Sequence, residues 1–202
     1  MTLLESEADL RDCYDAPNET VQKKILSRLD RHARAFIGLS PLVMLATAGP
    51  EGADCSPRGD APGFVRVEDD STLLLPDRRG NNLIDSLRNV VQQPSVGLLF
   101  LVPGINETLR VNGSARIVTD AARLAPMEMQ GKVPASALEI SVREVFFHCG
   151  KALIRSELWN PEKHVPRSAF PTLGRIIADQ VAGVEAAALE ANLEDAYKTR
   201  LY

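Results

Sequence analysis

The chain has 202 residues, of which 45% are hydrophobic and 25% are charged, and its formal net charge is −4. Such a length and composition are typical of one globular domain, and the acidic balance argues against a broad nucleic-acid-binding surface. No apolar run approaches the roughly 20 residues that cross a bilayer, and the N-terminus lacks the basic start and apolar core of a signal peptide, so we expect no membrane association and a cytoplasmic location.

The first 40 residues are expected to form an arm and a helix. Residues 1–17 resemble a loosely attached arm. Residues 18–37 begin with a good N-cap and carry apolar side chains at spacings of four, which predicts one amphipathic helix. The N-cap is Asn18 and the apolar positions are Val21, Ile25, Leu29 and Ala33.

Seven stretches are predicted to be strands because they are continuously apolar or alternate in polarity. They lie at 42–48, 53–59, 63–69, 71–76, 95–103, 108–120 and 137–149. With few helices between them, they favour a barrel or sandwich over a doubly wound sheet. A barrel of this size fills its own interior, so a ligand must bind outside it, in a groove or at a subunit contact.

Helices are predicted after Gly80, at 120–129, as a turn at 150–159, and over 171–201, where Gly183 weakens the middle. We therefore divide the chain into three parts. Residues 1–40 form the arm and helix, 41–160 the β-domain, and 161–202 a loop and a long helix that packs on the barrel or on a dimer partner.

The sequence lacks phosphate-loop, dinucleotide, zinc-protease and serine-hydrolase motifs. Its three histidines lie in different segments, so no metal site is predicted, and its three cysteines are expected to be buried apolar residues. The absence of an evident protein acid, base or nucleophile favours chemistry that is carried by a cofactor.

The stretch "PDRRGNN", residues 76–82, places Arg78 and Arg79 together where a strand gives way to a helix. A helix N-terminus binds anions, arginine adds charge, and Gly80 permits a close backbone approach, so this turn is a candidate phosphate site. The alternative is an ordinary helix start, with Asn81 as the N-cap and both arginines in water.

Three further stretches carry basic or aromatic side chains, and each stretch allows two interpretations. In "SPRGD", Arg58 either reaches the same anion as Arg78 or forms a surface pair with Asp60. In "TLRVNGSAR", Arg110 and Arg116 share one strand face that is either solvated or a ligand or dimer wall. In "GKALIRSELW", Lys151, Arg155 and Trp159 form either a basic face beside an aromatic plate or a helix whose tryptophan plugs the core.

Taken in order, these motifs resemble the FMN-binding split β-barrel of the pyridoxamine 5′-phosphate oxidase superfamily, and in particular a bacterial subgroup of FMN-dependent enzymes. The resemblance rests on "LATAGPEGADCSPRGDAPGFVRV", "TLLLPDRRGNNLIDSLRN", "VGLLFLVPG", "TLRVNGSARI" and "CGKALIRSELWNP", which span roughly residues 42–161. It implies a mainly β fold with flanking helices: a split barrel of six or seven antiparallel strands, an N-terminal helix and a long C-terminal helix.

The resemblance also implies a homodimer with FMN at the subunit contact. The expected cofactor-binding residues are Ser56, Arg58, Pro76, Asp77, Arg78, Asn81, Asn82, Arg110, Lys151, Arg155 and Trp159. The function expected is flavin-mediated hydride or electron transfer to a small molecule, with NAD(P)H as a candidate electron donor. The alternatives are a non-catalytic flavin, haem or deazaflavin binder, and a structural dimer that has lost its ligand. The superfamily's serine and two basic phosphate ligands align with Asn81, Asn82 and Leu83, which leaves Arg58, Arg78 or Arg79 to neutralise the phosphate.

Overall fold

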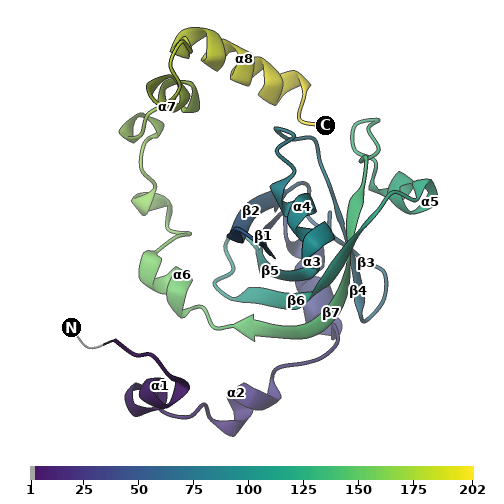
Figure 1. Cartoon of the computed structure of the whole chain (residues 1–202), viewed down its shortest axis with the longest axis vertical. Coiled ribbons are helices and arrows are strands. Elements are labelled where there is room, and N and C mark those ends of the chain that lie inside the picture. The colour runs from purple at the N-terminus through teal and green to yellow at the C-terminus, as the bar shows by residue number, and fades with distance from the viewer. Residues whose placement is uncertain (1–2) are drawn as a thin grey trace.

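The computed structural model describes residues 3–202 and contains one seven-stranded antiparallel sheet in the order β2-β1-β5-β6-β7-β4-β3. The sheet curls into a split barrel with helices around it (Figure 1), which confirms the predicted fold class. The strands are β1 (Leu42–Gly49), β2 (Gly52–Gly59), β3 (Arg66–Val67), β4 (Thr72–Pro76), β5 (Ser95–Leu101), β6 (Thr108–Val118) and β7 (Ala137–His148).

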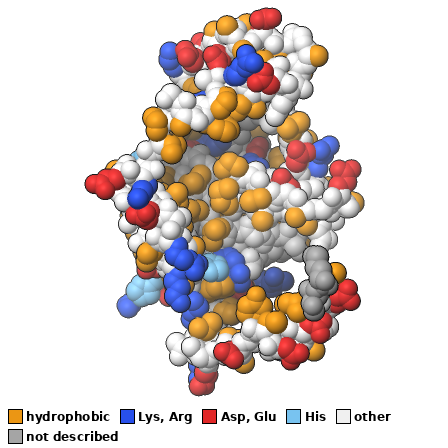
Figure 2. Space-filling model, turned by 90° about the vertical axis from the view of Figure 1, so that its left-hand side faces the viewer, with side chains coloured by type: hydrophobic (Ala, Val, Ile, Leu, Met, Phe, Trp, Pro, Cys, Tyr) orange, Lys and Arg blue, Asp and Glu red, His pale blue; other side chains and the backbone are white. Residues whose placement is uncertain are grey.

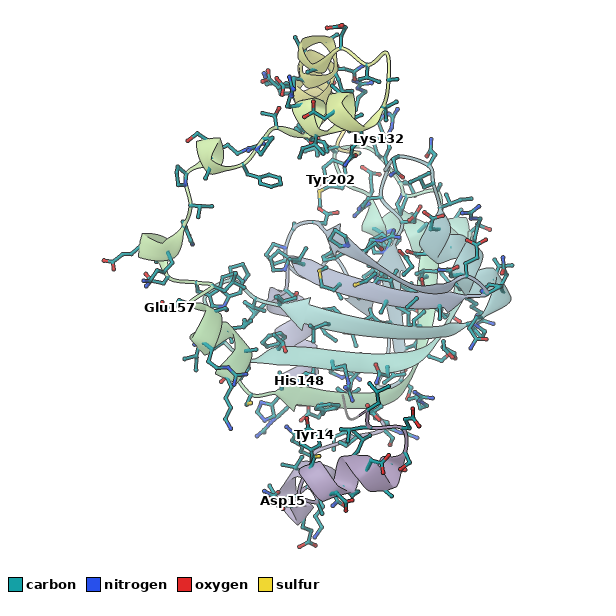
Figure 3. All side chains as sticks on the ribbon, turned by 60° about the vertical axis from the view of Figure 1, so that its left-hand side comes forward. Tyr14, Asp15, Lys132, His148, Glu157 and Tyr202 are labelled. Atoms are coloured by element: carbon teal, nitrogen blue, oxygen red, sulfur yellow. The ribbon has the colours of Figure 1, made fainter. Side chains whose placement is uncertain are left out.

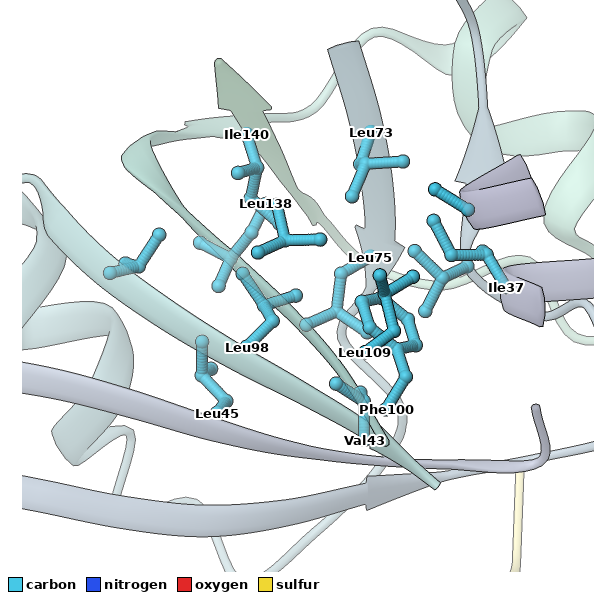
Figure 4. Close-up of a cluster of buried hydrophobic side chains, with 14 of the residues drawn as sticks. Ile37, Val43, Leu45, Leu73, Leu75, Leu98, Phe100, Leu109, Leu138 and Ile140 are labelled. Atoms are coloured by element: carbon cyan, nitrogen blue, oxygen red, sulfur yellow. The ribbon is translucent and has the colours of Figure 1, made fainter. Parts of the chain in front are cut away.

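Side chains fill the inside of the barrel, as expected for its size (Figure 4). Alternate positions of each strand point inward, and α3 (Arg31–Leu39) adds one apolar side of its own. Among the side chains that are fully buried are Ile37, Leu45, Leu73, Phe100 and Leu109. At Asn112 and Gly113 the register of β6 against β7 shifts, which marks a β-bulge.

The single helix predicted over residues 18–37 is wrong. The segment forms α2 (Glu19–Lys23) and α3, and the chain between them runs along the barrel. Leu26 exchanges two backbone hydrogen bonds with Val145 of β7, at 2.9 and 2.8 Å. Pairing with this strand satisfies the backbone groups that a continuous helix would have used, so tertiary structure overrides the local pattern.

The C-terminal segment also differs from the prediction of one long helix. It forms α6 (Lys151–Ser156), two single 3-10 turns, and then two helices that pack on each other, α7 (Leu173–Gln180) and α8 (Ala186–Thr199). Gly183 adopts a positive φ of 83° in the connection, which makes a reversal possible where the sequence suggested only a weak point. The arm contains a further helix, α1 (Glu7–Cys13), which Ser6 and Asp9 cap reciprocally.

Two smaller predictions are also corrected. The strand expected over 63–69 is reduced to β3, because Gly63 turns the chain with a φ of 81°. The three cysteines, Cys13, Cys55 and Cys149, are exposed rather than buried. Within the described residues, no helix has the length and apolar character needed to cross a membrane.

Candidate functional site

A pocket of about 450 Å³ opens where β2 and β4 end, beside α4 (Asp85–Gln92). Most of its lining comes from three parts of the chain: β2, the loop of residues 77–84, and the N-terminus of α4. The lining residues are Asp54, Ser56, Pro57, Arg58, Gly59, Phe64, Pro76, Asp77, Arg78, Arg79, Gly80, Asn81, Asn82, Leu83, Ile84, Asp85, Ser86 and Leu87.

This pocket brings together seven of the eleven predicted site residues, from two segments about 20 positions apart in the chain. They are Ser56, Arg58, Pro76, Asp77, Arg78, Asn81 and Asn82. The antiparallel register explains the convergence: β2 follows β1 at one end of the sheet, β4 lies near its other end, and the curled sheet brings the two together. The hypothesis that Arg58 and Arg78 reach the same anion requires these two segments to lie close together.

Two reciprocal ion pairs join the two segments. Arg58 Nη1 donates to Asp77 Oδ1 at 2.7 Å, and Arg78 Nε donates to Asp60 Oδ2 at 2.6 Å. The alternative in which Arg58 forms a surface pair with Asp60 is therefore wrong. The carboxylates largely offset the charges of Arg58 and Arg78, so neither guanidinium is a free cation in this arrangement.

Arg79 is the one lining arginine for which the described part of the chain supplies no carboxylate or hydrogen-bond partner. Arg79 is also exposed to solvent. A guanidinium without a protein partner retains its donors for an incoming anion. Of the two adjacent arginines, Arg79 and not Arg78 is therefore free of protein partners in the described residues.

The N-terminus of α4 faces the pocket without a side-chain cap. The alternative of an ordinary helix start with Asn81 as the N-cap is wrong: Asn81 Oδ1 accepts from the backbone N–H of Leu83 at 3.0 Å, and the helix begins at Asp85. Ile84 occupies the cap position with a φ of 53°, a left-handed conformation that is costly for a β-branched residue. The first turn therefore presents unpaired N–H groups and the positive end of the helix dipole to the pocket.

Asp54 and Ser86 are among the pocket residues that were not predicted. Ser86 Oγ donates to Asp54 Oδ2 at 2.8 Å and lies 3.1 Å from Ser56 Oγ. Ser86 is buried, with 3% of its surface exposed. Asp54, Ser56 and Arg58 alternate along β2 and so share one strand face. That spacing was a usable signal for Asp54, whereas Ser86 carried no motif.

The other four predicted residues do not line this pocket of the same chain. Arg110 donates to Glu144 at 2.8 Å and stacks 4.0 Å from the ring centre of Phe146. Trp159 is half-buried and donates from Nε1 to the carbonyl of Ile105 at 2.9 Å. Lys151 and Arg155 are exposed on α6. These positions are separate from the pocket unless a second subunit brings them to it.

The fold and the pocket define a split β-barrel with a pocket outside the barrel core. Residues 29–149 match the model of the pyridoxamine 5′-phosphate oxidase family. This match covers more than half of the chain, and the chain therefore belongs to that family. The C-terminal residues 150–202 lie outside the matched region.

Several solved structures are similar in fold. HupZ of Group A Streptococcus is 19% identical, with a TM-score of 0.48 over 59% of this chain and 93% of that chain. An FMN-binding protein of Syntrophomonas wolfei is 11% identical, with a TM-score of 0.45 over 58% and 84%. General Stress Protein 26 of Bacillus anthracis is 15% identical, with a TM-score of 0.41 over 57% and 93%. No curated protein matches the chain.

Proposed function

We propose that this protein binds FMN and acts as an FMN-dependent oxidoreductase on a small molecule. The observation that carries the proposal is the uncapped N-terminus of α4, which opens into the same pocket as the unpaired Arg79. Helix N–H groups together with a free guanidinium are the donors that a phosphate dianion requires.

The pocket suits a flavin mononucleotide in size and chemistry. Its volume of about 450 Å³ lies within the range of small-molecule sites. Arg79 and the first turn of α4 would hold the phosphate, and the hydroxyls of Ser56 and Ser86 in the same lining would hydrogen-bond to the polyol. Phe64 and Leu87 add apolar surface to the same lining.

When bound, FMN supplies hydride or electron transfer, and the protein supplies binding and orientation. Arg58 and Asp77 fix the corner between β2 and the 77–84 loop, so the cofactor meets a preorganised wall. A positive group near the ring's N1 and C2 carbonyl stabilises negative charge there, and Lys151, Arg155 or Arg116 are our candidates for that position. NADH or NADPH is the candidate electron donor.

We further propose a homodimer that completes the site. The chain exposes 13396 Å² of surface, whereas a compact monomer of this mass exposes about 9,300 Å². The excess is several times the roughly 800 Å² that each partner buries in a standard interface. Figure 2 shows apolar side chains across the hollowed face between the C-terminal helices, α7 and α8, and the N-terminal helices. A partner on this face would bring Lys151, Arg155 and Trp159 toward the ring.

A second candidate is a non-catalytic flavin carrier. The lining residues include no histidine, cysteine, tyrosine or lysine, and the three aspartates among them, Asp54, Asp77 and Asp85, each accept a hydrogen bond from a neighbouring side chain. The same lining offers a haem no histidine, cysteine, methionine or tyrosine as an axial ligand, which disfavours haem at this pocket.

Spectroscopy of the purified protein separates these functions. The oxidoreductase predicts a yellow protein that releases FMN on denaturation and is bleached by NADH or NADPH. Stable yellow colour without turnover supports the carrier. A colourless protein that takes up no added FMN contradicts both. Light scattering of the full chain tests the dimer.

A further inference from the structure

The last residue of the chain contacts the candidate site of the same chain. The Tyr202 hydroxyl donates to Asp60 Oδ1 at 2.7 Å, and its ring centre lies 5.6 Å from the guanidinium carbon of Arg78. Figure 3 shows Tyr202 between the C-terminal helices, α7 and α8, and the barrel, on the same side as Lys132. Tyr202 is separated from Asp60 by 142 positions and lies outside the family-matched region.

Asp60 connects Tyr202 to the pocket. Its side chain is fully buried, and both of its oxygens are used. Oδ1 accepts from Tyr202 and from the backbone N–H of Ala61, at 2.7 Å each, while Oδ2 accepts from Arg78 Nε at 2.6 Å. Arg78 also donates from Nη1 to the carbonyl of Met127 at 2.7 Å, so two hydrogen-bond acceptors and the nearby ring of Tyr202 set its position.

The loop that carries Arg78 and Arg79 separates two cavities. On one side lies the candidate flavin pocket, and on the other lies a cavity of about 360 Å³. Asp77, Arg78, Arg79, Gly80 and Asn82 line both, and Tyr202 lines only the second. Tyr202 therefore supports the loop from behind, without entering the pocket in which the cofactor would bind.

We propose that Tyr202 is a positioning residue that holds the Asp60–Arg78 pair, and through it the phosphate-binding loop, in place. This proposal rests on the proposed FMN function. The phenol hydrogen bond to a buried carboxylate is charge-assisted, and its loss leaves one Asp60 oxygen with fewer donors. Asp60 then holds Arg78 less firmly, the loop samples other positions, and the phosphate loses preorganised donors.

The test compares FMN with riboflavin, which lacks the phosphate. Titrations of the full-length protein, followed by quenching of flavin fluorescence, give both dissociation constants for the wild type and for Tyr202→Phe. We expect FMN to bind about 10-fold more weakly to the variant and riboflavin to bind equally well. Tyr202→Leu, which also removes the ring from Arg78, should show at least the same loss. Tyr197→Phe is the control, because Tyr197 is 58% exposed on α8 and its hydroxyl has no hydrogen-bond partner in the described structure.

The outcomes separate the two proposals. If the wild type binds FMN and Tyr202→Phe leaves both constants unchanged, the role of Tyr202 is refuted while the FMN function stands. An equal loss of FMN and riboflavin also refutes it, because a general structural effect does not discriminate on the phosphate. A wild-type protein that binds neither flavin overturns the FMN function and the role of Tyr202 with it.

Discussion

Arg58 at the end of β2 and Asp77 just after β4 form an ion pair of 2.7 Å across the corner of the candidate site. Both side chains are about three-quarters buried, and the neighbouring Arg78–Asp60 pair runs in the opposite sense between the same two segments. The two pairs fix the corner and offset most of its charge. The proposed anion site therefore rests on Arg79 and the N-terminus of α4.

The Arg58–Asp77 pair should contribute measurably to stability. In a double-mutant cycle with Arg58→Ala and Asp77→Ala, we expect a coupling of about 1 kcal/mol, because the pair is partly desolvated. Urea unfolding of the four proteins measures it. The exposed Arg88–Asp85 pair on α4 is the control, with an expected coupling below about 0.5 kcal/mol. Equal couplings in the two cycles would contradict the prediction.

Arg79→Ala should weaken FMN binding about 10-fold, because it removes charge-assisted hydrogen bonds to the phosphate. Riboflavin affinity and the urea midpoint should not change, since Arg79 contacts no partner within residues 3–202. Arg143→Ala, at an exposed position of β7 outside the pocket lining, is the matched control. Unchanged FMN affinity in Arg79→Ala would show that Arg79 does not bind the phosphate.

Gly80→Ala tests whether a ligand approaches the backbone of the loop. A Cβ at Gly80 would meet no atom of the chain within 4 Å, so the variant should fold with unchanged stability. If the cofactor lies against this backbone, the added methyl group weakens FMN binding severalfold. Calorimetric titration of wild type and variant measures the change. Equal affinities would show that the ligand does not approach Gly80.

Gly113→Ala should destabilise the barrel by about 3 kcal/mol or more, because its Cβ would lie 2.1 Å from the carbonyl oxygen of Ser141 at the β6–β7 bulge. Gly38→Ala in α3 is the matched control: its Cβ meets nothing within 4 Å, and alanine in a helix should raise stability by about 0.5–1 kcal/mol. Thermal unfolding compares them. Similar melting temperatures would contradict the tight strand contact.

Glu139 should make stability depend on pH in the acidic range. The hydrogen bond from Arg116, assisted by Arg123, lowers the pKa of this buried carboxyl below its ordinary value of 4.5. Its contribution is present above pH 4.5 and is lost as pH falls through the lowered pKa of the folded state. Glu139→Gln should cost about 2 kcal/mol at pH 7. Unfolding at pH 7, 4 and 3 should show the difference shrinking; a constant difference would contradict this role.

The strands, the barrel class and the family could be predicted from the sequence, because alternation and turn residues act over a few neighbouring positions. The two segments that line the pocket were recognisable for the same reason. The break between α2 and α3 was not, since it depends on Leu26 pairing with Val145, more than 100 residues away. The reversal at Gly183 likewise depends on α7 packing against α8.

Within the candidate site, the sequence by itself placed two adjacent arginines at a tight corner, and only the tertiary structure decided which of them is free. Arg78 is held by Asp60, which lies 18 positions away, and Asp60 is held by Tyr202 at the other end of the chain. Local periodicity sets which side chains share a face, but ion pairing depends on distances across the folded sheet. No pattern in residues 76–82 contains that information.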